Sequence, residues 1–205
     1  VGVPIEMISP RLAGNVPGIV ISNAKYDQLI KDYGAVNVKT ITEAIAANEL
    51  SMGYTDPFAS STGLNFLLTA LHSFDSTNLL GETAVQGFEQ FQANVPFVAS
   101  TTLQMRDAAT SGVLDAFVLE YQMYQNEAEL KGAYKFIPFG VRHDSPLYAL
   151  GNISAEKKAI LRAFADFALQ PQYQERAKSF GFNGLEEYKS EIASVDGTLI
   201  NAAQK

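Results

Sequence analysis

Cysteine and tryptophan are both absent from this chain of 205 residues. Without cysteine there is no disulfide framework, thiolate zinc site, iron–sulfur cluster or cysteine nucleophile. Without tryptophan there is no indole face of the kind on which sugar ligands stack. The redox compartment stays open, because a cysteine-free chain suits either the cytosol or an extracytoplasmic space.

Positive charge is scarce as well. Lys plus Arg number 15 and Asp plus Glu number 22, which gives a formal net charge of -7. Nucleic acid and anionic lipid both need a basic surface, so neither is expected as a main partner. Between Thr40 and Met105 there is no Lys or Arg at all, while six acids occur. An anion bound by this stretch would rely on neutral donors, and a neutral or cationic ligand is the open alternative.

The common catalytic motifs are missing too. The chain has no G-x-S-x-G elbow, no H-E-x-x-H, no Walker loop and no G-x-G-x-x-G. Of its two histidines, His72 lies at the end of an apolar helical pattern, where the helix dipole favours it. His143, Asp144 and Ser145 are the three residue types of a triad, but triads are assembled from separated segments. We therefore expect no cofactor, no metal and no enzyme, with a hydrolase as the least favoured alternative.

No targeting or membrane-spanning segment is recognised. The longest uncharged stretch, residues 57–74, contains several hydroxyl side chains and an amide, which indicates a water-exposed helix and no membrane span. No signal peptide is found. Because residue 1 is Val, we expect a trimmed or partial chain.

Short apolar runs alternate with helical patterns, which is typical of an α/β protein. Strands are predicted at residues 18–21, 52–55, 95–98, 114–121 and 134–139. Helices are predicted at residues 23–34, 62–74, 83–92, 102–111, 154–169 and 171–181. Thr40 and Glu43 have the spacing of a capping box, which predicts a further helix that starts at Thr40.

Two clusters of hydroxyl residues lie immediately before predicted helices. The first comprises Ser60, Ser61 and Thr62, followed by Gly63, and the second comprises Ser100, Thr101 and Thr102. Hydroxyls and free backbone N–H groups at a helix start form a binding site for an oxyanion or a carbonyl. Ordinary helix capping explains a single cluster, but three hydroxyls followed by a glycine exceed what one cap requires. Gly63 also lacks a Cβ where a ligand could approach the backbone.

Residues 53–67 (GYTDPFASSTGLNFL) resemble the lobe-crossing segment of type II periplasmic solute-binding proteins. There a strand leads into a turn similar to N-P-x-S-S-G, and Asp56 stands here in place of the Asn. Further segments resemble later parts of the same family: residues 111–121 its second-lobe strand, 136–140 its return crossing, and 145–148 with the helix through Phe164 and Phe167 its closing elements. The resemblance extends from about residue 18 to residue 184.

This resemblance implies an α/β fold with two lobes. Residues 1–55 and 133–205 would form the first lobe, and residues 56–132 the second. Family members begin with a β-α-β-α-β stretch that this chain lacks, so the first lobe is expected to be incomplete and the chain a fragment. The closest resemblance is to solute-binding segments joined to von Willebrand factor A domains, and phosphate- and molybdate-binding proteins resemble the chain more distantly.

The function that the resemblance implies is capture of a small ligand between two closing lobes outside the cytoplasm, and an oxyanion is one option for that ligand. A membrane permease, or a von Willebrand factor A domain of the same protein, would be the partner. Besides the hydroxyl clusters, Glu120 and Tyr121 at a strand end and Arg142 after the return crossing are candidate ligand contacts. An exposed strand end explains Glu120 and Tyr121 equally well, and a surface charge explains Arg142 better. The alternative is a surface protein-interaction domain that kept the fold without a ligand.

Overall fold

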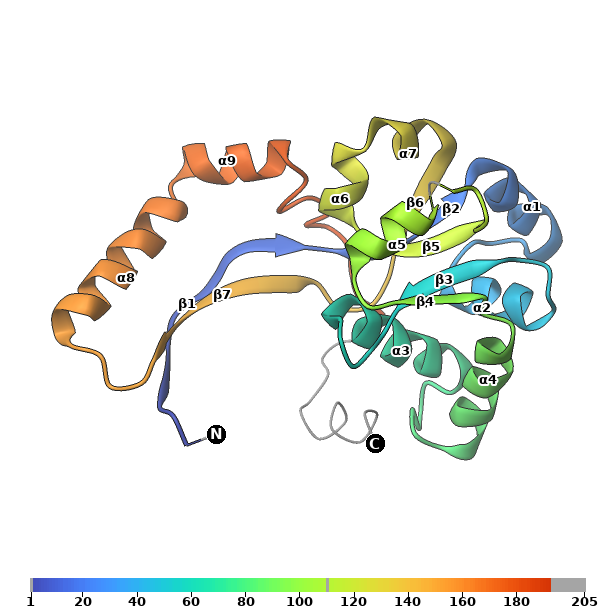
Figure 1. Ribbon diagram of the computed structural model, residues 1–205, viewed down its shortest axis with the longest axis horizontal. Helices are drawn as coiled ribbons and strands as arrows, with labels where there is room; N and C mark the ends of the chain where they lie inside the picture. Colours follow the sequence, from blue (N-terminus) through green and yellow to red (C-terminus); the bar gives the residue numbers. More distant parts are fainter. Residues whose placement is uncertain (1, 110, 193–205) are drawn as a thin grey trace.

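The computed structural model describes residues 2–109 and 111–192 of the chain. They form a lobe built on a mixed sheet, from which an arm made of a two-stranded ribbon and two helices extends (Figure 1). The strands are β1 (Ile5–Asn15), β2 (Pro17–Ser22), β3 (Met52–Thr55), β4 (Phe97–Ala99), β5 (Ala116–Glu120), β6 (Tyr134–Pro138) and β7 (His143–Leu150).

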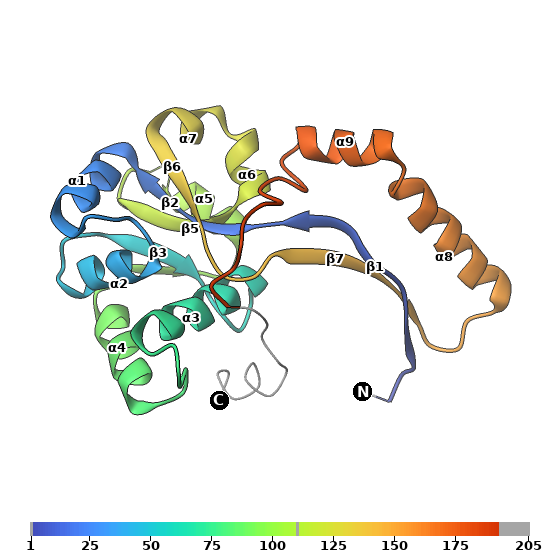
Figure 2. The same ribbon diagram turned by 180° about the vertical axis from the view of Figure 1, so that it is seen from behind.

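The helices lie mostly between strands in the chain. They are α1 (Asn23–Tyr33), α2 (Val38–Ala46), α3 (Ser61–Phe74), α4 (Glu82–Ala93), α5 (Thr102–Ala109), α6 (Tyr121–Asn126), α7 (Ala128–Ala133), α8 (Ala155–Ala168) and α9 (Pro171–Ser179). The first seven surround the sheet of the lobe, and α8 and α9 belong to the arm, as both views show (Figures 1 and 2).

The sheet of the lobe has the strand order β4-β3-β5-β2-β6. Strand β3 runs parallel to β4 and β5, whereas β2 runs antiparallel to β5 and β6. Side chains of β2 alternate between the two faces, as the pleat requires. Ile19 and Ile21 join a core formed with α1 to α4, and Val20 joins a second core formed with α5 and α7.

The arm is a long antiparallel pairing of β1 with β7, from Ile5 opposite Leu150 to Asn15 opposite His143. Helix α8 is joined to the ribbon by ion pairs from Lys158 and Arg162 to Glu6. The arm buries little of its apolar surface. Large side chains that remain about half exposed or more are Ile5, Met7, Leu150, Ile160, Phe164 and Phe167.

All five predicted strands and all six helices predicted as ranges are present, with ends shifted by a few residues. The capping box predicted for Thr40 and Glu43 is wrong. Helix α2 begins two residues earlier, and Asn37 is its cap, with Thr40 as the third helical residue that closes the box. Neither strand of the arm is predicted from the sequence, although β7 includes residues 145–148 of the family resemblance.

The sheet also differs from the expected division into lobes. Strands β2 and β3 come from residues 1–55, and β4 and β5 from residues 56–132, yet all four share one sheet. The chain thus enters the lobe from β1 and leaves it into β7, the two strands of the arm, and does not leave it after Thr55. The reason is that β3 pairs directly with β4 and β5, so no lobe boundary can lie between them.

Candidate functional site

A hollow of about 280 Å³ lies at one edge of the sheet. Its lining consists of Ala59, Ser60, Ser61, Thr62, Ser100, Thr101, Thr102 and Glu120. Both predicted hydroxyl clusters and one of the predicted strand-end residues therefore meet in one place. Because β3, β4 and β5 are parallel, their carboxyl ends share this edge, which is where ligands bind in open α/β sheets.

The first helix start in the hollow belongs to α3. Ser60 caps it, and its Oγ accepts a hydrogen bond of 3.3 Å from the backbone N–H of Gly63. The neighbouring Ser61 is exposed and hydrogen-bonded to no described side chain, whereas Thr62 is buried and donates to Glu120 at 2.7 Å. One hydroxyl therefore serves the helix, one serves a carboxylate, and Ser61 stays available to a ligand.

The second helix start belongs to α5. The Oγ1 of Thr101 accepts from the N–H of Gln104, and the Oε1 of Gln104 accepts from the N–H of Ser100, both at 3.1 Å. This reciprocal pair holds the turn in the manner of a capping box. The hydroxyls of Ser100 and Thr102 bond to no described residue, so they join Ser61 as free donors around the hollow.

Glu120 is held by three donors at the joint between lobe and arm. Its Oε1 accepts from Thr62 and, at 2.8 Å, from Nδ1 of His143, and its Oε2 accepts from Nδ2 of Asn15. Asn15 and His143 lie opposite each other at the end of the ribbon, while Thr62 lies on α3. A single carboxylate thus connects both strands of the arm to the lobe.

The donors around Glu120 have fixed orientations. The Oδ1 of Asn15 accepts the N–H groups of Val16 and Gln122, so its Nδ2 must face Glu120. Asn65 is fixed in the same way, since its Oδ1 accepts the N–H of Val141, and its Nδ2 lies 3.0 Å from Nε2 of His143. In the neutral ring Nε2 accepts from Asn65, which places the remaining ring proton on Nδ1, facing Glu120.

The network keeps Glu120 ionised. Its side chain is 17% exposed, and burial by itself would raise the pKa of the carboxyl. The hydrogen bond from His143 and the charge of its protonated ring, with the hydrogen bonds from Thr62 and Asn15, outweigh the burial, and the pKa of Glu120 lies below its ordinary value. The hollow accordingly contains one negative charge, and no Lys or Arg is part of its lining.

The order of these groups differs from that of a nucleophilic triad. In a triad the imidazole lies between the carboxylate and the hydroxyl and takes the hydroxyl proton. Here the carboxylate of Glu120 lies between His143 and Thr62, so neither ring nitrogen meets the Thr62 hydroxyl. Asp144 pairs with Arg142, and Ser145 lies on β7 opposite Ala13. The arrangement positions the hydroxyl without activating it.

Gly63 has a different role from the one the sequence suggested. A Cβ at this position would lie 1.9 Å from the carbonyl oxygen of Thr55. The missing side chain therefore allows α3 to approach the end of β3, and the space is not left for a ligand. Gly63 contributes to the hollow only by letting the helix start lie against the strand.

Gly63→Ala is expected to lower the free energy of unfolding by about 2 kcal/mol, because the new methyl group overlaps backbone atoms that cannot rotate away. Urea unfolding measures the change. Gly132→Ala on α7 is the matched control, because a Cβ there meets nothing within 4 Å and alanine favours a helix. Equal stability of the two variants would contradict the close approach of α3 to β3.

Two further candidate residues do not line the hollow. The ring of Tyr121 packs against Phe136, at 5.2 Å between centroids, and a Cβ on Gly184 would lie 2.4 Å from it. Arg142 forms ion pairs with Asp144 and Glu186 at the base of the arm. Tyr121 thus packs against β6 and the segment after α9, and Arg142 links β7 to that same segment.

His143, Asn65 and Asn15 belong to the surroundings of the site. The sequence did not point to Asn65 or Asn15, and it drew attention to His143 only as one of three triad residue types. Asn15 and His143 bond to Glu120, Asn65 orients His143, and no local motif marks such contacts. Within the described residues, no group of three or more acidic or histidine side chains is arranged to hold a metal ion. In the same part of the chain, no helix has both the length and the apolar character needed to cross a membrane.

Known structures share this fold at low sequence identity. A protein described as an extracellular solute-binding protein from Bordetella parapertussis matches 98% of this chain and 66% of its own, with 15% identity and a TM-score of 0.69. An ABC transporter structure from Clostridium perfringens matches 95% of this chain and 65% of its own, with 15% identity and a TM-score of 0.64.

The sulfate-binding protein SubI from Mycobacterium tuberculosis matches 93% of this chain and 60% of its own, with 13% identity and a TM-score of 0.61. The chain thus spans about two thirds or less of the length of these structures. No curated protein sequence matches it.

A family profile decides the relationship. The profile described as bacterial extracellular solute-binding protein matches residues 9–183, which include the whole sheet, the hollow and most of the arm. On that match, with the two-lobed fold of its structural neighbours, the chain belongs to the bacterial extracellular solute-binding protein family.

Proposed function

We propose that the hollow is the half of a solute-binding cleft that this chain supplies. The observation that carries the proposal is the meeting of the helix starts of α3 and α5 with the end of β5 around one opening. Free hydroxyls of Ser61, Ser100 and Thr102, with the unpaired first N–H groups of two helices, offer donors to a small polar ligand. Closure of a second lobe over the opening would complete the site.

The proposed ligand is a small oxyanion bound by neutral donors, as the name of the sulfate-binding neighbour illustrates for a related fold. The ionised Glu120 limits this choice, because it repels an anion that comes close to it. A neutral or cationic polar solute is therefore the second candidate, and Glu120 is the observation in its favour. In either case the helix starts supply the contacts.

We further propose that the lobe of β2 to β6 is the complete lobe and that the arm belongs to an incomplete one. The exposed apolar side chains of β1, β7 and α8 support this, because such surfaces are normally covered. The chain also matches only 66% and 65% of the length of two solved neighbours, which supports the proposal as well. The whole protein would then present its closed form outside the cytoplasm to an ABC permease. The resemblance to segments joined to von Willebrand factor A domains makes such a domain a further proposed partner.

Thermal unfolding with sulfate, phosphate, molybdate and a panel of neutral and cationic solutes tests the proposal. A ligand of the hollow at about a hundredfold its Kd should raise Tm by roughly 5–10 °C. Ser61→Ala combined with Ser100→Ala removes one free hydroxyl from each helix start and should abolish the rise, with the Tm without ligand unchanged.

Ser179→Ala is the control for that double variant, because its hydroxyl bonds only to Arg176 within α9. It should keep the full rise. A rise that persists in the double variant would place the ligand elsewhere. If the chain, extended by the segment proposed to complete the lobe of the arm, shows no rise with any solute, the protein-interaction alternative is favoured instead.

A further inference from the structure

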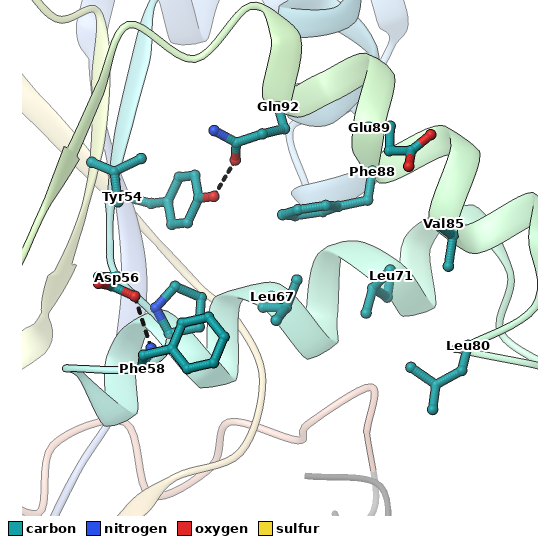
Figure 3. Close-up of a pocket in the computed structure, with 12 residues that line it drawn as sticks. Tyr54, Asp56, Phe58, Leu67, Leu71, Leu80, Val85, Phe88, Glu89 and Gln92 are labelled. Carbon is teal, nitrogen blue, oxygen red and sulfur yellow. Dashed lines mark hydrogen bonds between the residues drawn. The ribbon is translucent and has the colours of Figure 1, made fainter. Parts of the chain in front are cut away.

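A second and larger cavity, of about 600 Å³, lies between α3 and α4 and shares none of its lining residues with the hydroxyl-lined hollow. Its walls are apolar, with Leu67 and Leu71 from α3 facing Val85 and Phe88 from α4 (Figure 3). We call it the α3–α4 groove. Its size lies in the range of small-molecule sites, and apolar walls with few polar groups are typical of such sites.

The floor of the groove is closed by a fixed polar pair. The hydroxyl of Tyr54 donates to Oε1 of Gln92, as Figure 3 shows. Tyr54 is 4% exposed, and burial, with a smaller contribution from the charge of Asp56, raises its pKa to about 12. The hydroxyl therefore stays protonated and paired, and the floor presents an aromatic ring with a satisfied polar tip.

One end of the groove combines an exposed aromatic ring with the acidic side chain of Asp56, and a second acid, Glu89, lies on α4 toward the other end (Figure 3). Phe58 is 73% exposed and lies beside Asp56, which accepts the N–H of Phe58 at 2.8 Å through Oδ1 (Figure 3). Neither Oδ2 of Asp56 nor the carboxylate of Glu89 is bonded to a described residue. Asp56 and Glu89 are the charged residues of the lining, and no Lys or Arg occurs from Thr40 to Met105.

We propose that the α3–α4 groove binds a small organic cation, with its apolar body between the helices and its ammonium group beside Asp56 and the ring of Phe58. Glu89, toward the other end of the groove, adds to the negative charge of the lining (Figure 3). Carboxylates complement the charge, and the rings of Phe58 and Phe88 offer faces that attract cations. The closed floor gives the groove the depth for one apolar group. This site is separate from the proposed solute cleft, although Asp56 to Phe58 and Ser60 belong to the same turn.

Three ligands with the same apolar body test the charge preference. They are 4-phenylbutylammonium, 4-phenylbutanol and 4-phenylbutanoate, titrated into the full chain and followed by the NMR signals of the leucine methyl groups. The ammonium ligand should bind about tenfold tighter than the alcohol, and the carboxylate weakest. Asp56→Asn combined with Glu89→Gln should remove the tenfold preference but keep the binding of the alcohol.

A variant at the rim checks the location. Val85 is 39% exposed and lies on the α4 wall, so Val85→Arg should fold normally, place a bulky cation in the groove and abolish binding of the ammonium ligand (Figure 3). Ser61→Ala with Ser100→Ala should leave this binding unchanged, which separates the groove from the solute cleft. Equal affinities for the three ligands, or tighter binding of the carboxylate, would overturn the proposal. So would binding of a basic apolar peptide with none of the three small ligands, which would assign the groove to a protein partner.

Discussion

Glu120→Ala is expected to lower the free energy of unfolding by about 3 kcal/mol at neutral pH. The substitution leaves Thr62, His143 and Asn15 without an acceptor at the joint between lobe and arm. Backbone groups fix the orientation of Asn15 and Asn65, so the network cannot rearrange to satisfy itself. Urea unfolding gives the change, and Glu187→Ala, at an exposed acid of the same charge, should alter stability by less than about 0.5 kcal/mol.

The pH dependence of this effect follows from the sign of the pKa shift. Because the pKa of Glu120 is lower in the folded than in the unfolded protein, its contribution is complete above the ordinary value of 4.5 and is lost as the pH falls through the lowered pKa. The stability difference between wild type and Glu120→Gln should therefore be largest near pH 7 and shrink under acid conditions. A difference that is constant from pH 7 to about pH 3 would contradict an ionised Glu120.

Self-association of the chain on its own is the second large effect that we expect. Ile5 and Leu150 are register partners on the ribbon and each is 65% exposed, and on α8 Ile160 is 67% exposed. Exposed apolar surface of this kind favours association with another molecule. Light scattering should accordingly give a mass of at least twice the 22.2 kDa of the monomer.

Ile160→Lys combined with Phe164→Glu tests the cause of that association. The pair lies four residues apart on α8 and replaces two exposed apolar side chains by a compatible ion pair. We expect it to shift the mass toward that of the monomer. Val113→Lys, which changes an equally exposed residue of the lobe, should not. A wild-type chain that stays monomeric at high concentration would contradict self-association through the exposed apolar side chains of the arm.

The lining of the hollow could be predicted from the sequence because the signals for it are local. Short apolar strands followed by Ser and Thr residues predict helix starts at the carboxyl ends of parallel strands, and the sheet brings these ends together. The role of Gly63 was misjudged for a physical reason. A glycine at a helix start fits a ligand or a close strand equally well, and only the position of the Thr55 carbonyl decides between them.

The arm and the Glu120 network could not be predicted from the sequence in the same way. Strand β1 contains Pro10 and Gly14, which weaken a local strand signal, and its partner β7 is distant in the chain. His143 looked like part of a triad with its own neighbours, whereas its actual contacts come from β5 and α3. The expected lobe boundary after Thr55 rested on the family-like turn at Asp56. In the structure no break in the sheet occurs there, because β3 pairs with β4 and β5 from the other side of that turn.

The central position of β2 has a consequence for how this lobe assembles. Ile19 pairs with Val118 on one side and with Ile137 on the other, so an early segment of the chain needs two late ones. During synthesis the strand emerges long before either neighbour, and the entropy of closing such long loops delays its insertion. The parallel unit of β3, β4 and β5 can form from contiguous chain, and β2 would then enter last, beside β5 and together with β6.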